Sequence, residues 1–262
     1  MRKLKKDKLY TFLTSLSAII FMWIAWFVAY KCVKNEYLLP SFSETMKSFF
    51  EILTEKFFYK SLIKTVYRVL LSFSISLVLG GTLAIIGKIF YRFSQFVKPF
   101  MSIIRTLPTM AILVIILIYA GVSTAPIIVA ILVLLPMIYK QFTTALEQID
   151  QGLTWAMQVY NISKKDRIKK IYAPIITPSI ARNIGSNLSF AIKLVISAEV
   201  MSYTFISIGG MMQVSNALME IPRLMALTLI SVVLGLIVEF VFYLIFKKAF
   251  KWQKGEQVDD RN

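Results

Sequence analysis

Histidine is absent from this 262-residue chain, and cysteine occurs once, at Cys32. The lack of histidine removes the commonest general base and the commonest metal ligand. A single cysteine forms neither an intrachain disulfide nor a redox pair. Acidic residues are also scarce, with 14 Asp and Glu against 30 Lys and Arg, and they do not cluster at metal-ligand spacing. We therefore expect no metal centre and no enzyme active site in this chain.

Apolar residues are abundant instead, at 57% of the chain, and the mean hydropathy is +0.69. They gather in runs of about 20 residues, the length with which a helix crosses the hydrocarbon core. The net charge of +16 fits this picture, because Lys and Arg collect in the cytoplasmic loops of membrane proteins. The sequence therefore predicts an integral protein of the lipid bilayer, with no nucleic-acid partner.

The predicted fold is an all-α bundle of six transmembrane helices. The apolar run after the basic N-terminus resembles a signal peptide, but it is too long and no A-x-A site follows, so we interpret it as an uncleaved first span. Residues 1–9 and 248–262 are expected to be cytoplasmic ends, 31–60 an external segment, and 61–247 the main transmembrane domain. The six spans are expected at residues 10–30, 62–86, 101–120, 126–139, 184–206 and 224–246.

The segments between the spans carry further signals. Ser41 and Glu44 form a capping box before an amphipathic helix, which either lies in the membrane interface or packs on the protein's own surface. Gly80 and Gly81 permit close helix approach in the second span. The third span contains Pro108, and the fourth contains Pro136 near its end. We expect a short basic loop with Lys88, Arg92 and Lys98, and a loop from Gly209 to Arg223.

Charge asymmetry predicts the orientation. With the N-terminus inside, the inner segments hold most of the Lys and Arg, whereas the short turn at 121–125 has none. The segment after the first span has lysines that are accompanied by four glutamates. Both termini are therefore expected on the cytoplasmic side.

The polar segment 140–182 is the only long loop between the predicted spans. Its pattern indicates two short helices, of which the first ends near Tyr160 and Asn161 adopts a left-handed turn. Ser163 then caps the next helix, with Asp166 three residues later, and Pro174 is expected to break that helix. A connection between two spans needs only a few residues. The segment is therefore either a docking site for a cytoplasmic partner or a knob that packs on its own bundle.

This segment resembles the EAA loop of binding-protein-dependent ABC importer permeases, whose pattern is E-A-A-x-x-x-G, nine residues and I-x-L-P. Ala156, Ile171 and Pro174 match the pattern, and Asn161 replaces the glycine. Trp155 departs from the expected glutamate. The resemblance assigns the coupling to an ATPase to an EAA-like loop at 147–182, through Trp155, Ala156, Met157, Asn161, Ile162, Ser163, Ile171 and Pro174.

The resemblance covers roughly residues 39–252 and is closest to the nitrate, sulfonate and taurine branch. LPSFSE, KTVYRVLLSFSISLVLGGTLAIIG, PFMSIIRTLPTMAILVIILIYAG and FAIKLVISAEVMS resemble stretches of that branch in the same order. The resemblance implies a type I (MetI-like) importer fold, in which a permease dimer forms the translocation pathway. It also suggests a small organic anion, sulfonate, nitrate or vitamin precursor as substrate.

The implied partners are an ABC ATPase, an extracytoplasmic substrate-binding protein and a second permease subunit, identical or related. The chain contains no G-x-x-x-x-G-K-[ST] motif, so we expect no bound cofactor and ATP hydrolysis by the partner. The implied location is a cell membrane, of a bacterium, with multiple passes.

Five charged residues fall in or near the predicted spans: Arg68, Arg105, Lys193, Glu199 and Glu239. Such residues usually pair with one another, face a bundle interior or line an aqueous path. Glu239 is a candidate to form an ion pair with Arg105 or with Lys193. The candidates for a translocation path or gate are Lys193, Ser197, Glu199, Ser202 and Glu239. Met201, Met211 and Met212 are interpreted as packing residues.

Two other classes of function stay open. A stand-alone secondary transporter or channel would be driven by an ion gradient and unaffected by loss of an ATPase, but no convincing internal repeat is visible. A membrane enzyme or scaffold is the third class, and a scaffold would dock a partner without moving a substrate.

Overall fold

The structure is a computed structural model that describes residues 14, 17, 20–21, 23–32 and 39–249. All regular secondary structure in this part of the chain is helical. Four helical stretches are long and apolar enough to cross a membrane: α3 (Lys56–Ile89), α6 (Ala125–Glu147), the stretch Lys164–Met201, and α11 (Ile221–Ala249). They correspond to the second, fourth, fifth and sixth predicted spans. The first predicted span, 10–30, lies partly outside the described residues, and residues 23–30 of it are helical.

The third predicted span is broken. A single helix over 101–120 is wrong, because α4 (Tyr91–Thr106) and α5 (Thr109–Ala120) meet at 96°. Pro108 has no N–H and its ring excludes helical backbone at the preceding residue, and Leu107 is accordingly extended, with ψ 135°. The short basic loop expected before this span is wrong too, because Lys88 lies in the last turn of α3 and Arg92 and Lys98 belong to α4. The bent pair counts as a fifth candidate span.

The long loop 140–182 is shorter in the structure than predicted. α6 continues to Glu147, so Pro136 lies inside it rather than near its end. After α7 (Gln151–Val159), α8 (Lys164–Asp166) and a π-helix (Arg167–Tyr172), α9 (Ala173–Met201) begins. The break expected at Pro174 is absent, because the chain is helical without interruption from Lys164 to Met201.

The loop expected from Gly209 to Arg223 is also corrected. The fifth span ends at Met201 rather than at 206, and residues 208–217 form the helix α10 (Ile208–Ala217). Ser207 starts α10 by accepting a hydrogen bond from the N–H of Gly210, at 2.8 Å. Met211 and Met212 are buried in the core as packing residues, whereas Met201 is exposed.

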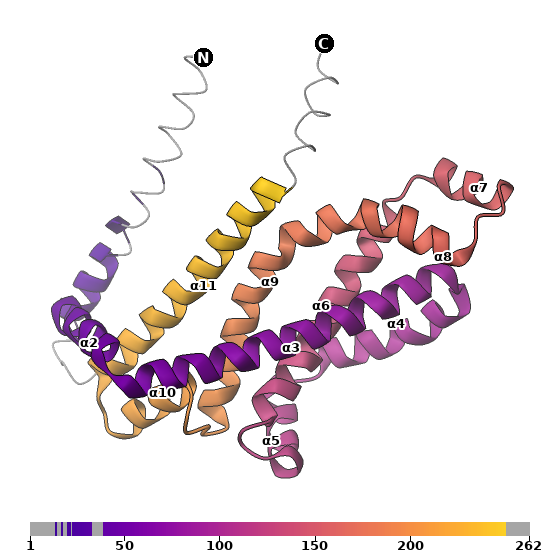
Figure 1. Ribbon diagram of the computed structural model, residues 1–262. Helices are drawn as coiled ribbons and strands as arrows, with labels where there is room; N and C mark the ends of the chain where they lie inside the picture. The colour runs from indigo at the N-terminus through magenta and orange to yellow at the C-terminus, as the bar shows by residue number, and fades with distance from the viewer. Residues whose placement is uncertain (1–13, 15–16, 18–19, 22, 33–38, 250–262) are drawn as a thin grey trace, which may run out of the picture.

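The bundle has two distinct ends (Figure 1). α7 and α8 lie at one end, together with the C-terminal end of α11, and α10 and the α5–α6 turn lie at the other. α9 curves as it runs between the two ends (Figure 1). Glycine permits close contact between α3 and α6, because a Cβ on Gly80 of α3 would lie 3.1 Å from Ile138 Cγ2 of α6. This confirms the close approach expected at Gly80.

The helix α2 (Phe42–Thr54) begins with the predicted capping box. The N–H of Glu44 donates to Ser41 Oγ at 3.2 Å, and the N–H of Ser41 donates back to Glu44 at 3.1 Å. Ile52 of α2 is fully buried in the main core, so the helix packs on the bundle. Phe42 and Phe50 stay exposed on its other side.

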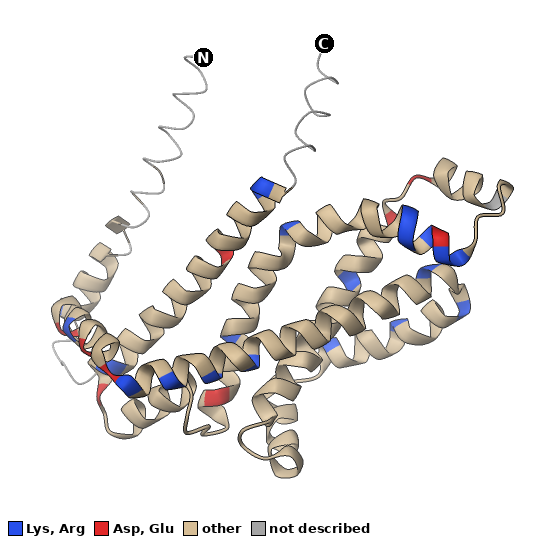
Figure 2. Ribbon diagram, in the orientation of Figure 1, with Lys and Arg blue, Asp and Glu red and all other residues tan. Residues whose placement is uncertain are grey.

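Charge differs between the two ends of the bundle (Figure 2). The end with α7 carries few acidic residues and many basic ones, among them Lys164, Lys165, Lys169 and Lys170. At the other end, the first turns of α3 and the helix α2 mix both signs, and Arg223 Nη2 forms an ion pair with Glu55 at 2.6 Å. This distribution agrees with a cytoplasmic position for the α7 end.

Candidate functional site

The segment from Gln148 to Tyr172, which we call the knob, is held in shape by its own side chains. Asp150 accepts a hydrogen bond from the N–H of Leu153 at the start of α7, at 3.2 Å. Asn161 follows α7 with φ 49°, the left-handed conformation predicted for it. Ser163 Oγ then accepts from the N–H of Asp166, at 3.2 Å, as the capping signal predicted. The geometry of both predicted turn residues is therefore confirmed.

Arg167 closes the knob, and sequence reasoning gave it no role. Its Nε donates to the carbonyl of Ile162 at 2.8 Å, and its Nη2 donates to that of Met157 at 3.2 Å. The carbonyl of Ile162 lies in the turn after α7. The carbonyl of Met157 lies in the last turn of α7 and also accepts from the N–H of Ile162, at 3.1 Å. Lys164 Nζ lies 4.2 Å from the ring centroid of Phe90, which adds a cation–π contact between α8 and the corner of α3 and α4. The knob is thus fixed to the bundle.

The knob has two faces. Met157 and Tyr172 are buried, at 1% and 4% exposure, and pack with α3, α4 and α6 in one core cluster. On the outer face, Trp155 and Tyr160 are 70% and 79% exposed. The structure therefore combines the two alternatives left open by the sequence, because one face packs on the bundle and the other is free among the described residues.

The predicted coupling residues divide between these faces. Trp155, Asn161, Ser163 and Pro174 are exposed, and Met157 is buried. The remaining three are half-buried between the knob and the bundle: Ala156, Ile162 and Ile171.

A buried ion pair lies at the opposite end of the bundle. Arg68 Nη1 of α3 and Glu199 Oε1 of α9 are 2.9 Å apart, with the two side chains 7% and 0% exposed. The hydroxyl of Thr65 lies 3.0 and 2.9 Å from the two Glu199 oxygens. The N–H of Gly209 in α10 donates to Glu199 as well, at 3.3 Å. Several partners compensate the cost of burying both charges.

Hydrogen bonds extend this cluster into two turns. Arg68 Nη1 donates to the carbonyl of Ile206 and Nε to that of Ser123, both at 3.3 Å. Thr204 Oγ1 lies 2.7 Å from Ser202 Oγ and donates to the carbonyl of Val122, also at 2.7 Å. The cluster therefore connects α3, the end of α9, α10 and the α5–α6 turn.

Two glycines allow α10 to approach this cluster. A Cβ on Gly209 would lie 2.6 Å from the backbone N of Val200, and one on Gly210 would lie 2.8 Å from the carbonyl oxygen of Phe205. Backbone atoms cannot move aside as the end of a flexible side chain can. The sequence interpretation of these glycines as loop residues missed this packing role.

A cavity of about 420 Å³ lies between α9 and α11. Lys193 and Ser197 of α9 and Glu239 of α11 are exposed and line it. Glu239 accepts a hydrogen bond from Ser186 at 2.9 Å. The expected ion pair of Glu239 with Arg105 or Lys193 is absent, and all three residues are described.

The five candidate path residues thus fall in two places. Lys193, Ser197 and Glu239 share the cavity between α9 and α11, whereas Glu199 and Ser202 belong to the buried cluster. Sequence reasoning flagged Arg68 and Glu199 separately but missed Thr65, whose hydroxyl receives the N–H of Ile208 at 3.0 Å. It also missed the reciprocal amide pair of Gln141 and Asn187, which joins α6 to α9 at 2.9 and 2.8 Å. For Thr65 and for the Gln141–Asn187 pair, the only signal in the sequence was a polar residue within a largely apolar run.

Comparison with known proteins places the chain in a family. The family model described as binding-protein-dependent transport system inner membrane component matches residues 56–251. The putative aliphatic sulfonates transport permease protein SsuC of Bacillus subtilis is 21% identical over 220 residues, which are 83% of this chain and 79% of that protein. The glycine betaine/proline betaine permease ProW of Salmonella typhimurium is 25% identical over 123 residues, 47% of this chain. The match spans 33% of ProW, about a third of its length.

A solved structure shares the fold. In a bacterial alginate ABC transporter, crystallised with an alginate pentasaccharide-bound periplasmic protein, one chain has a TM-score of 0.65 and 14% identity. The match covers 95% of this chain and 98% of that chain. Because the family model covers most of the sequence, this multi-pass membrane chain belongs to the family of binding-protein-dependent transport system inner membrane components.

Proposed function

We propose that the chain is the transmembrane permease subunit of an ATP-driven importer. It would form the translocation pathway as a dimer with an identical or related subunit, and receive substrate from an extracytoplasmic binding protein. The observation that carries the proposal is the knob, whose inner face is packed on the bundle while Trp155 and Tyr160 face outward. This geometry suits docking into a separate ATPase, which hydrolyses the ATP.

The knob continues into the membrane without interruption. Lys164–Met201 is one helical stretch of 38 residues, and its far end carries Glu199 of the buried cluster. A displacement of the knob by an ATPase would therefore act on α10 and the α5–α6 turn through α9. Rigid-body movement of this kind is a common route to alternating access.

We propose the cavity between α9 and α11 as part of the substrate path. It presents Lys193 and Glu239, one charge of each sign, beside the hydroxyl of Ser197. The relatives SsuC and ProW are named for the transport of aliphatic sulfonates and of betaines, so both ligand classes should be tried. A location in the cell membrane of a bacterium, with both termini cytoplasmic, is part of the same proposal.

The test is reconstitution. The chain is co-expressed with candidate ABC ATPase subunits, and the purified complex is placed in liposomes with candidate binding proteins. We expect uptake of a labelled sulfonate or betaine that needs ATP and stops when the phosphate-loop lysine of the ATPase is replaced. Uptake that follows an ion gradient and ignores the ATPase would select the stand-alone transporter instead.

A further inference from the structure

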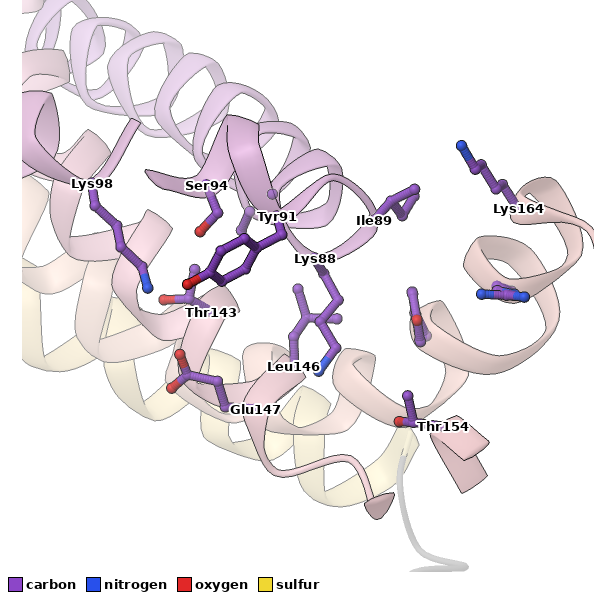
Figure 3. Close-up of a pocket in the computed structure, with 14 residues that line it drawn as sticks. Lys88, Ile89, Tyr91, Ser94, Lys98, Thr143, Leu146, Glu147, Thr154 and Lys164 are labelled. Carbon is purple, nitrogen blue, oxygen red and sulfur yellow. The ribbon is translucent and has the colours of Figure 1, made fainter. Parts of the chain in front are cut away.

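A second cavity, of about 450 Å³, lies between the bundle and the knob (Figure 3). Its walls come from the last turn of α3, the first turns of α4, the end of α6 and the knob. The lining includes four basic side chains, Lys88, Lys98, Lys164 and Arg167, against one acidic side chain, Glu147. The cavity therefore has an excess of positive charge.

Two of these cations are available to a ligand. Arg167 is held by carbonyls of the knob, and Lys164 lies over the ring of Phe90. Lys88 and Lys98 form no ion pair within 4 Å among the described residues, and neither does Glu147. Figure 3 shows Lys98 reaching into the cavity on the side of Thr143 and Glu147, with the Tyr91 ring between Lys98 and Lys88. Two ammonium groups without an ion-pair partner among the described residues thus share one cavity.

Hydroxyl groups complete the lining. Tyr91, Ser94, Thr143 and Thr154 all contribute to the walls. Ammonium and hydroxyl donors together suit an oxygen-rich anion, because hydrogen bonds to an ionised acceptor are stronger than neutral ones. Phosphate is such an anion, and lysine is a common phosphate-binding residue that acts as a point charge.

The position of the cavity points to the membrane edge. Lys88 lies in the last turn of the predicted span α3, and residues of the knob line the same cavity. On α4, Phe96 and Phe100 are exposed at 64% and 50%, and Lys98 between them in sequence lines the cavity. A lipid could place its phosphate among the lysines and its acyl chains along such an apolar surface. Basic pockets between spans on the cytoplasmic side are known sites for anionic headgroups.

We propose that this cavity binds a phosphate group, carried by an anionic lipid headgroup or by a free phosphate compound. The bound group contacts α3, α4 and the knob at once, so its presence holds the knob against the bundle. The proposal rests on the cavity and its charges, and it stands or falls independently of transport.

The experiment uses the full chain in detergent. Native mass spectrometry compares retention of phosphatidylglycerol and phosphatidylcholine, and equilibrium dialysis measures binding of radiolabelled inorganic phosphate. The test variant is Lys88→Gln with Lys98→Gln. The matched control is Arg92→Gln with Lys247→Gln, which removes two cations at the same end of the bundle but outside the cavity lining. Thermal melts check that both double variants fold.

The lipid-retention and phosphate-binding measurements distinguish the two sources of the phosphate group. At least fivefold lower phosphatidylglycerol retention in the test variant, with the control and phosphatidylcholine unchanged, supports a lipid headgroup. A loss of inorganic phosphate binding in the test variant alone supports a free phosphate compound. Wild-type protein that binds neither, or equal losses in test and control variants, overturns the proposal. If the test variant does not fold, Glu147→Gln replaces it, and this variant must bind the same probe more tightly than wild type.

Discussion

Arg68 and Glu199 form an ion pair at 2.9 Å between residues 131 positions apart, and it joins α3 to α9 at the end of the bundle away from the knob. Both side chains are shielded from solvent. Loss of one partner leaves an uncompensated charge, whereas loss of both does not. This asymmetry makes the pair a sensitive probe of the fold.

We expect Glu199→Gln to destabilise the protein by about 3–5 kcal/mol, because Arg68 then keeps its buried charge without a counterion. The double variant Arg68→Met with Glu199→Gln should recover part of the loss. Unfolding of the purified chain in detergent, followed by circular dichroism, measures both. Glu239→Gln, at an exposed carboxylate, is the control and should change stability by less than about 1 kcal/mol. Equal stabilities of the Glu199 and Glu239 variants would contradict the cluster.

We expect Gly210→Ala and Gly209→Ala each to destabilise the protein strongly. The new Cβ meets backbone of the 199–207 segment, which α10 cannot avoid without moving. Gly152→Ala is the matched control, because there the added methyl meets only the end of the Asp150 side chain, at 2.8 Å. The melting temperature of each variant gives the answer, and a normal value for Gly210→Ala would show that α10 does not pack as described.

Trp155→Ala should separate docking from folding. The side chain is 70% exposed, so its loss should change stability by no more than about 0.5 kcal/mol. A buried aromatic anchor in an interface typically contributes 2 kcal/mol or more, so affinity for the ATPase should fall by about 30-fold or more. Binding of the ATPase to immobilised chain measures this. Phe50→Ala, also exposed but on α2, is the control, and an identical ATPase affinity in both variants would exclude Trp155 as an anchor.

The left-handed backbone at Asn161 should make the stability of the knob depend on the residue type at this position. Its φ of 49° disfavours β-branched residues, so Asn161→Val should cost about 1–2 kcal/mol, whereas Asn161→Gly should be tolerated. Limited proteolysis within the knob reports the difference. Equal cleavage rates for the two variants would show that the left-handed turn is unimportant.

The local signals were the part of the fold that the sequence predicted well. Ser41 with Glu44, Ser163 with Asp166, and the turn at Asn161 all depend on residues close in the chain, so spacing alone specifies them. The apolar runs of α3, α6, α9 and α11 were found because their length is set by the bilayer.

The rest depends on partners that lie far apart in the chain. The pairing of Arg68 with Glu199 could not be read from sequence, because several charges in apolar runs were equally possible partners. Gly209 and Gly210 suggested a loop by composition, but they serve close packing against α9. Pro108 was recognised, yet the 96° direction change it produces depends on how α5 packs against α6.

Two prolines lie between the knob and the buried cluster, Pro174 at the start of α9 and Pro178 within it. Each removes a backbone donor, so the helix is more compliant there than elsewhere along its length. A push on the knob is therefore converted partly into bending near these residues, and only the remaining rotation reaches Glu199. Pro178→Ala should make the helix stiffer at this position. The knob and the Glu199 end of α9 should then move by equal amounts, which spin labels at the two ends of the helical stretch can detect.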